Sequence, residues 1–196
     1  MSKRTEIYNY VKGKLIILEN ASPERCGASL ARLRRGIGKP PGSLPDLWEW
    51  TFDGLPDDLT SKTSAPTSAE WAIHISMSLY SFHQQGRTIT VENMYKENIS
   101  LGKAVSLLAG NQQEEKERFQ SKLEMLIKAD SIEMISALLR QIISQLRRKG
   151  IPLDYPALAV DIFDLQYDDS RDKVILKWGR DYYSENRKDI QEKGEE

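Results

Sequence analysis

Residues 130–150 read DSIEMISALLRQIISQLRRKG, and this stretch decides the fold class. Asp130 and Glu133 have the spacing of a capping box, and Gly150 offers a helix end. Between them the apolar residues recur at steps of three and four, the period of a helix with one buried face: Ile135, Leu139, Ile142 and Leu146. The stretch therefore predicts a strong amphipathic helix.

The same period recurs outward from this stretch in both directions. We expect further helices at about 5–19, 23–36, 68–86, 100–108, 112–128, from Asp154 onward, and 170–183. In the third of these, the residues expected to point inward are Trp71, Ile75, Leu79 and Phe82. No segment shows period-two alternation bounded by hairpin turns. The sequence predicts an all-α fold, a compact bundle of seven to eight short helices without significant sheet.

A loop rich in proline interrupts the first half of the chain. Five of the eight prolines lie between Gly38 and Pro66, so we expect a long, partly mobile connection there. Within it, LWEWTF at 47–52 is apolar and predicts a short segment docked on the core or on a partner. We expect one helical domain over 1–183, divided near residue 110, and a charged tail at 184–196 that frays.

Composition allows a folded core but gives no global signal of a nucleic-acid binder. The 196 residues are 39% apolar, and 28 Lys and Arg face 29 Asp and Glu for a net charge of −1. Any site for a polyanion must therefore be local. A lone cysteine, Cys26, and the lack of an apolar run of ~18 residues or of a leader-like start fit a soluble cytoplasmic protein without membrane contact.

The residues that would carry catalysis do not form a recognisable set. His74 and His83 are nine residues apart on one expected helix, which places them on opposite faces and argues against a shared metal. Cys26 lies on an apolar helix face without a base beside it. GIGKPPGS at 36–43 has two prolines where a phosphate loop needs backbone donors. We expect no catalytic residues, no metal and no cofactor, and rank an enzyme such as a nuclease last.

Two helices instead separate a basic face from a buried one. In the helix at 23–36, Arg25, Arg32 and Arg35 gather about 150° from the apolar stripe. Arg34 lies on the flank, and Lys39 extends the basic patch into the following loop. Residues 22–42 carry five basic side chains and one acid, a local charge of +4.

The helix at 130–150 repeats this arrangement. Arg140 and Arg147 point about 120° away from the apolar stripe, with Arg148 and Lys149 near the end and no acid from 139 to 151. Two interpretations stay open. These cations can contact nucleic acid, or they can be a solvated face that also favours the negative end of the helix dipole.

Six strings of this sequence, in order, resemble the CasB family, the small subunit of the type I-E CRISPR Cascade complex. They are ARLRRGIGKPPGSLPDLWEW (31–50), SLYSFHQQG (78–86), ISLGKAVSLLAG (99–110), KERFQSKLEMLIKAD (116–130), LLRQIISQLRRKGIPLDYPALAVDIFDLQ (138–166) and LKWGRDYY (176–183). Together they cover nearly the whole chain. None is a catalytic fingerprint, and the resemblance depends on their order and spacing. The loop at 53–67 and the charged tail match nothing in the family.

The resemblance implies a non-catalytic helical subunit in antiviral defence, present as two copies beside the backbone and large subunits of Cascade. It would stabilise guide RNA, target DNA and the displaced strand of the R-loop, while base pairing reads the sequence. Basic positions of the family motifs coincide with Arg34, Arg35, Lys103, Arg118, Lys128 and Arg140. With the basic faces, the expected contact set is Arg32, Arg34, Arg35, Lys39, Lys103, Arg118, Lys128, Arg140, Arg147 and Arg148. The alternative is a spacer subunit without nucleic-acid contact. Salt-dependent binding of single-stranded DNA by the isolated protein would distinguish the two.

Overall fold

The computed structural model describes the backbone of residues 1–110 and 113–193, and the side chains of these ranges as far as Ser184. The described chain is helical, with no strand and one isolated bridge between Tyr95 and Leu153. Its α-helices are α1 (Lys3–Glu19), α2 (Pro23–Arg35), α3 (Trp48–Thr51), α4 (Ser68–His83), α5 (Leu101–Ala109), α6 (Gln113–Ile127), α7 (Ile132–Lys149), α8 (Tyr155–Leu165) and α9 (Asp168–Lys193), and a 3-10 helix, η1, covers Pro45–Leu47. The all-α prediction is confirmed.

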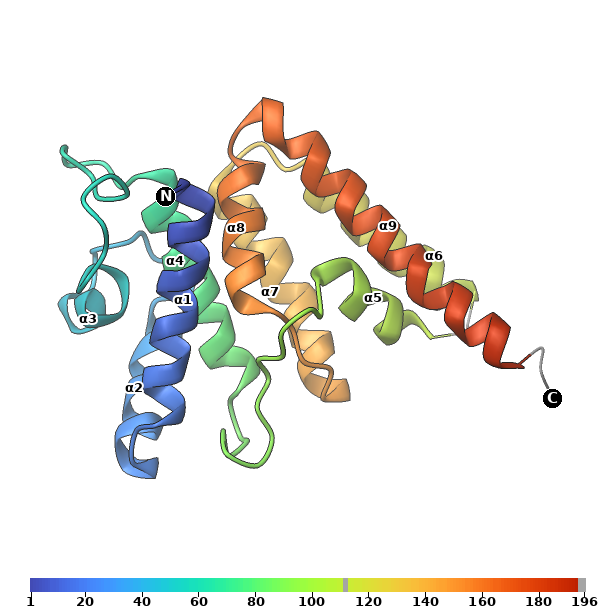
Figure 1. Ribbon diagram of the computed structural model, residues 1–196, viewed down its shortest axis with the longest axis horizontal. Helices are drawn as coiled ribbons and strands as arrows, with labels where there is room; N and C mark the ends of the chain where they lie inside the picture. The colour runs from blue at the N-terminus through green and yellow to red at the C-terminus, as the bar shows by residue number, and fades with distance from the viewer. Residues whose placement is uncertain (111–112, 194–196) are drawn as a thin grey trace.

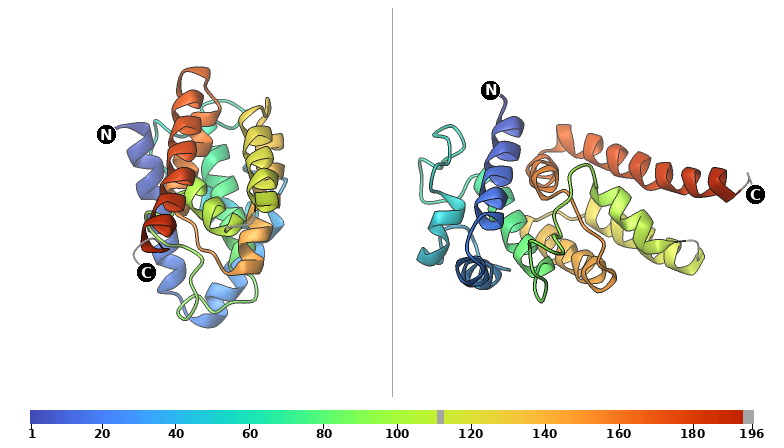
Figure 2. Two further views of the ribbon diagram at one scale, coloured as in Figure 1. Left: turned by 90° about the vertical axis from the view of Figure 1, so that its right-hand side faces the viewer. Right: turned by 60° about the horizontal axis from the view of Figure 1, so that its bottom comes forward.

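Helix α4 is the centre of the fold. From Ala69 to Ser81 every residue of α4 except Trp71 is buried, because α1, α2, α7 and α8 all pack against it. Helices α1 and α2 cover one side, while α5, α6 and α9 extend to the other, where α5 packs along α9 (Figure 1). Two further views show α6 and α9 as separate rods on that side of the molecule (Figure 2). Helix α7 lies between α4 and α6 and contacts both.

Side-chain caps fix where the helices begin. At α4, the Thr67 hydroxyl accepts from the Glu70 N–H and the Glu70 carboxylate accepts from the Thr67 N–H, a complete capping box. The capping box predicted for Asp130 with Glu133 is wrong. Ser131 has an extended backbone and its hydroxyl accepts from the Met134 N–H at 3.2 Å, so α7 begins one residue later and Asp130 stays outside it.

The proline-rich connection contains a docked segment, as predicted, and its fold adds one short helix to the expected count. Leu47 and Trp50 are buried, whereas Trp48 is half exposed and its Nε1 donates to the Gly42 carbonyl at 3.0 Å. The last helix also differs from the prediction, since α9 does not end at Tyr183 but continues to Lys193. Its charged residues include several good helix formers, which explains the continuation. The rest of the tail, 194–196, lies outside the described residues.

The two histidines contact different parts of the fold. His74 Nε2 lies 3.0 Å from the Gly36 carbonyl oxygen, whereas His83 Nδ1 lies 2.8 Å from the Tyr155 hydroxyl. Within the described ranges, no three His, Cys, Asp or Glu side chains form a group that could hold a metal ion. Across the same ranges no helix has the length and apolar character needed to cross a membrane.

Candidate nucleic-acid interface

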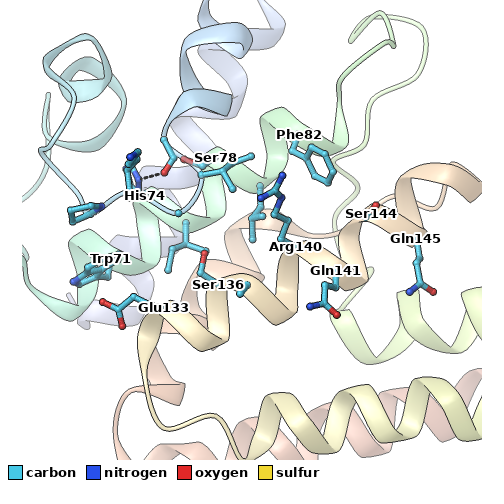
Figure 3. Close-up of a pocket in the computed structure, with 18 of the residues that line it drawn as sticks. Trp71, His74, Ser78, Phe82, Glu133, Ser136, Arg140, Gln141, Ser144 and Gln145 are labelled. Carbon is cyan, nitrogen blue, oxygen red and sulfur yellow. Dashed lines mark hydrogen bonds between the residues drawn. The ribbon is translucent and has the colours of Figure 1, made fainter.

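The polar side of α7 faces a groove that α4 and the turn after α2 complete (Figure 3). This α4–α7 groove has a volume of about 670 Å³. Trp71 and Glu133 lie at one end of it, and Arg140 points toward Phe82 farther along. Four cations line the groove against the single carboxylate of Glu133: Lys39, Lys122, Arg140 and Arg148.

A second groove continues the first on the other side of α7. This α5–α7 groove, about 570 Å³ in volume, lies between α5, α6 and α7 and shares Gln145 and Arg148 with the α4–α7 groove. The two together form one surface, here called the basic groove. Its six cations are Lys39, Arg118, Lys122, Arg140, Arg148 and Lys149, and its two carboxylates are Glu115 and Glu133. A polyanion would meet a strongly positive surface there, although the whole chain is nearly neutral.

Arginines gather around Phe82 at the edge of the basic groove. The guanidinium carbons of Arg140 and Arg147 lie 5.7 and 5.2 Å from the centre of the Phe82 ring. Arg34 approaches from α2, where one of its guanidinium nitrogens donates to the Ser81 carbonyl at 3.3 Å. Among the described residues none of the three arginines forms an ion pair with a carboxylate. An aromatic ring therefore positions Arg140 and Arg147 while their charge stays available to an anion.

The cations of this region lie close enough to affect one another. Burial lowers the pKa of Arg34, and the nearby charge of Arg147 lowers it further. Burial likewise lowers the pKa of Lys122, with added repulsion from Arg118 and Arg148. Like charges held together store repulsion that a bound phosphate would relieve, as is typical of anion sites.

The structure brings some of the predicted contact residues together at this surface. Lys39 and Arg140 line the α4–α7 groove, Arg118 lines the α5–α7 groove, and Arg148 lines both. Arg118 also pairs with Glu115 on α6. These residues come from three separate stretches of sequence, and α7 is the helix that all of them border.

The other predicted residues lie elsewhere. Arg35 is on the outer side of α2, where it pairs with Asp46 at 2.9 Å, and Arg32 is exposed on the same helix. Lys103 is half-buried on α5 and its Nζ donates to the Asn98 carbonyl. Lys128 is exposed just after the end of α6. None of these four lines the basic groove, and their role in binding stays a prediction.

The end of α7 bears on the helix-dipole interpretation of its cations. The carbonyl oxygen of Arg147 accepts a 2.6 Å hydrogen bond from a guanidinium nitrogen of Arg87, which lies in the loop after α4. The Arg147 side chain itself points to Phe82. A different arginine thus compensates this helix end, so the dipole alone does not explain where Arg147 lies.

Sequence reasoning missed three side chains of the groove. Trp71 and Phe82 were expected to point into the core, but both are only partly buried and line the α4–α7 groove. The α4 helix is buried nearly all round, so its period could not distinguish a core-facing from a groove-facing side. Lys122 could have been found, because it follows Arg118 by one helical turn and shares its face.

The fold and sequence were compared with known proteins. Residues 29–183 match the model of the CRISPR-associated protein Cse2 family. CasB from Thermobifida fusca superposes with a TM-score of 0.69 at 29% identity, over 92% of this chain and 97% of that one. A search among curated proteins finds no match.

Two more distant structures share the fold. A Cse2-family CRISPR-associated protein from Thermus thermophilus superposes with a TM-score of 0.65 at 19% identity, over 94% of this chain and 99% of that one. CasB from M. ruber gives 0.64 at 19% identity, over 97% of each chain. The family model spans most of the sequence, and the relatives are matched over nearly their full length. The chain therefore belongs to the Cse2 family of CRISPR-associated proteins, the family that includes CasB.

Proposed function

We propose that this chain is a non-catalytic, nucleic-acid-binding subunit of a type I-E Cascade complex. Its basic groove would contact phosphates of the guide RNA, the target DNA or the displaced strand of the R-loop. The observation that carries this proposal is the basic groove itself, with six cations against two carboxylates in a chain whose net charge is −1. Phosphate contacts of this kind bind without reading sequence, which suits a complex in which base pairing reads the target.

Membership of the Cse2 family supports the assignment to Cascade, as does the resemblance of the sequence to its small subunit. The backbone and large subunits and a second copy of this chain would then be its protein partners. A spacer without nucleic-acid contact is the second candidate. The pairs Arg25–Glu49 and Arg35–Asp46 favour it for α2, because local carboxylates already accompany the basic face of that helix.

The test removes two cations from the basic groove. Arg140→Ala with Arg148→Ala in the full chain, assembled into the complex, should flatten the slope of log affinity against log salt by about 1.4 on a single strand, at about 0.7 per lost phosphate contact. The loss should be similar for any DNA sequence. A salt titration of DNA binding, after intact assembly has been checked, measures both.

The matched control is Lys173→Ala with Arg180→Ala. This pair removes two exposed cations from α9, seven residues apart and outside the basic groove, and should leave the slope unchanged. A third variant, Arg32→Ala with Arg35→Ala, tests the outer face of α2. If the groove pair leaves slope and affinity intact, phosphate binding in the groove is wrong. If the α2 variant also leaves both unchanged, the spacer without nucleic-acid contact replaces the proposed function.

A further inference from the structure

The α4–α7 groove combines its cations with apolar and hydrogen-bonding walls. Trp71, Ile75 and Leu79 of α4 line one side. The opposite side, on α7, carries hydroxyl and amide groups from Ser136, Gln141, Ser144 and Gln145. Phosphate binding requires only cations, so it does not explain why the groove has one apolar side and one side with hydroxyl and amide groups. An apolar cavity with a few polar groups is typical of a site for an organic ring.

Several polar groups of the groove have no partner. Ser78 is only 2% exposed, and its Oγ forms no hydrogen bond with the described residues. The side-chain amides of Gln141 and Gln145 likewise form no hydrogen bond in the described part of the chain. Amides and hydroxyls can pair with the donors and acceptors on the edge of a base.

Trp71 and Phe82 differ in what lies over their rings. Phe82 carries the guanidinium groups of Arg140 and Arg147, whereas over Trp71 no cation lies among the described residues. Trp71 is also the one residue between Ala69 and Ser81 of α4 that is not buried. Its half-buried indole at the end of the groove is therefore available to a flat ring (Figure 3).

We infer that the α4–α7 groove holds an unstacked base of a single nucleic-acid strand against Trp71, while Lys39 and Arg140 hold the flanking phosphates. The inference rests on the proposed function and adds a contact with a base to the contacts with phosphates. Bases in a duplex are stacked and paired, so they cannot enter a groove lined by α4 and α7. Stacking on an aromatic ring tolerates any base, so the groove would bind a strand of any sequence.

The test compares two oligonucleotides of equal length and charge, oligothymidylate and the same backbone with abasic sites, on the full-length wild-type chain. Oligothymidylate should bind about tenfold more tightly, the scale of one base stacked on an aromatic ring, with the same salt slope for both. Trp71→Ala should remove this preference, and the matched substitution Trp48→Ala, at a half-exposed tryptophan outside the groove, should keep it. In addition, binding should quench the fluorescence component that Trp71→Phe removes.

The outcomes separate this inference from the proposed function. Equal binding of both oligonucleotides by the wild-type chain would overturn the base site and leave phosphate binding in place. Binding of neither at low salt would contradict both. If Trp71→Ala instead prevents assembly of the complex while the oligothymidylate preference persists, the groove holds a segment of a partner protein and the inference is wrong. The comparison on the wild-type chain needs no variant, so it stands even if Trp71→Ala does not fold.

Discussion

At the scale of single residues, the arginines around Phe82 show how a nearly neutral protein can keep charge for a partner. Arg25 and Arg35 on α2 have carboxylates beside them, whereas Arg140 and Arg147 rest on an aromatic ring. A ring positions a guanidinium without neutralising it. The local arrangement, and not the number of basic residues, therefore distinguishes the basic groove from the basic face of α2.

Substitution of Phe82 separates positioning from charge. Phe82→Leu keeps every cation but removes the ring under Arg140 and Arg147, so DNA affinity should fall by at most about five- to thirtyfold, given roughly 0.5–1 kcal/mol for each of the two cation–π contacts. The salt slope should not change, because the number of phosphate contacts is the same. Phe52→Leu, at a half-buried phenylalanine outside the groove, is the control. A flattened slope would show that the phosphate contacts themselves are lost.

His83 should make the stability of the protein depend on pH. Burial, with the charges of Arg87 and Arg147 nearby, lowers the pKa of His83 from 6.5 to about 3. Between these values the unfolded chain binds a proton that the native chain refuses, so the free energy of unfolding falls as the pH drops. From pH 7 to pH 5 the loss should be about 2 kcal/mol. Urea unfolding of wild type and His83→Gln measures it, and an equal pH dependence in both would contradict this assignment.

At the scale of elements, the sequence predicts helices whose apolar residues recur on one face. The bounds of α2 and the end of α7 follow from a cap, a terminal glycine and one clear apolar stripe, whereas the start of α7 is one residue later than its predicted cap implies. The sides of α4 could not be assigned, because a helix buried nearly all round has no polar stripe to orient it. The basic groove was only half predictable for a related reason: its cations show in the sequence, but which of them meet depends on how α4, α6 and α7 pack.

The contact between α5 and α9 depends on a glycine. A Cβ at Gly102 would lie 2.3 Å from the Trp178 carbonyl oxygen, and backbone atoms cannot move aside as a side chain would. Gly102→Ala should therefore push the two helices apart and lower the free energy of unfolding by about 1–3 kcal/mol. Gly179→Ala is the matched control on α9, where a Cβ meets nothing within 4 Å, and should stabilise slightly. Chemical denaturation compares them, and equal stability of the two variants would refute the close approach.

At the scale of the whole molecule, chain order and packing do not coincide. Helix α8 comes late in the sequence but packs against α1 and α4, and Arg4 on α1 reaches Asp164 on α8 at 2.8 Å. The Ser76 hydroxyl of α4 donates to the Tyr155 carbonyl at 2.8 Å. One continuous hydrophobic cluster runs from Ile7 to Tyr182. Helix α8, which follows the expected division near residue 110, thus packs against helices that precede it, and the domain organisation itself stays a prediction.

This packing predicts that the chain unfolds as one unit. Calorimetry of the full chain should show a single transition whose calorimetric and van't Hoff enthalpies agree, because one hydrophobic cluster spans both halves. A fragment of residues 1–110 should lack a cooperative transition, since without α7 and α8 the apolar faces of α1 and α4 stay exposed to water. The full chain with Arg4→Ala is the control: it removes one ion pair whose arginine is half exposed, leaves the hydrophobic cluster intact, and should still melt in one step. Two transitions in the full chain, or a cooperative melt of the fragment, would show that the first half folds independently.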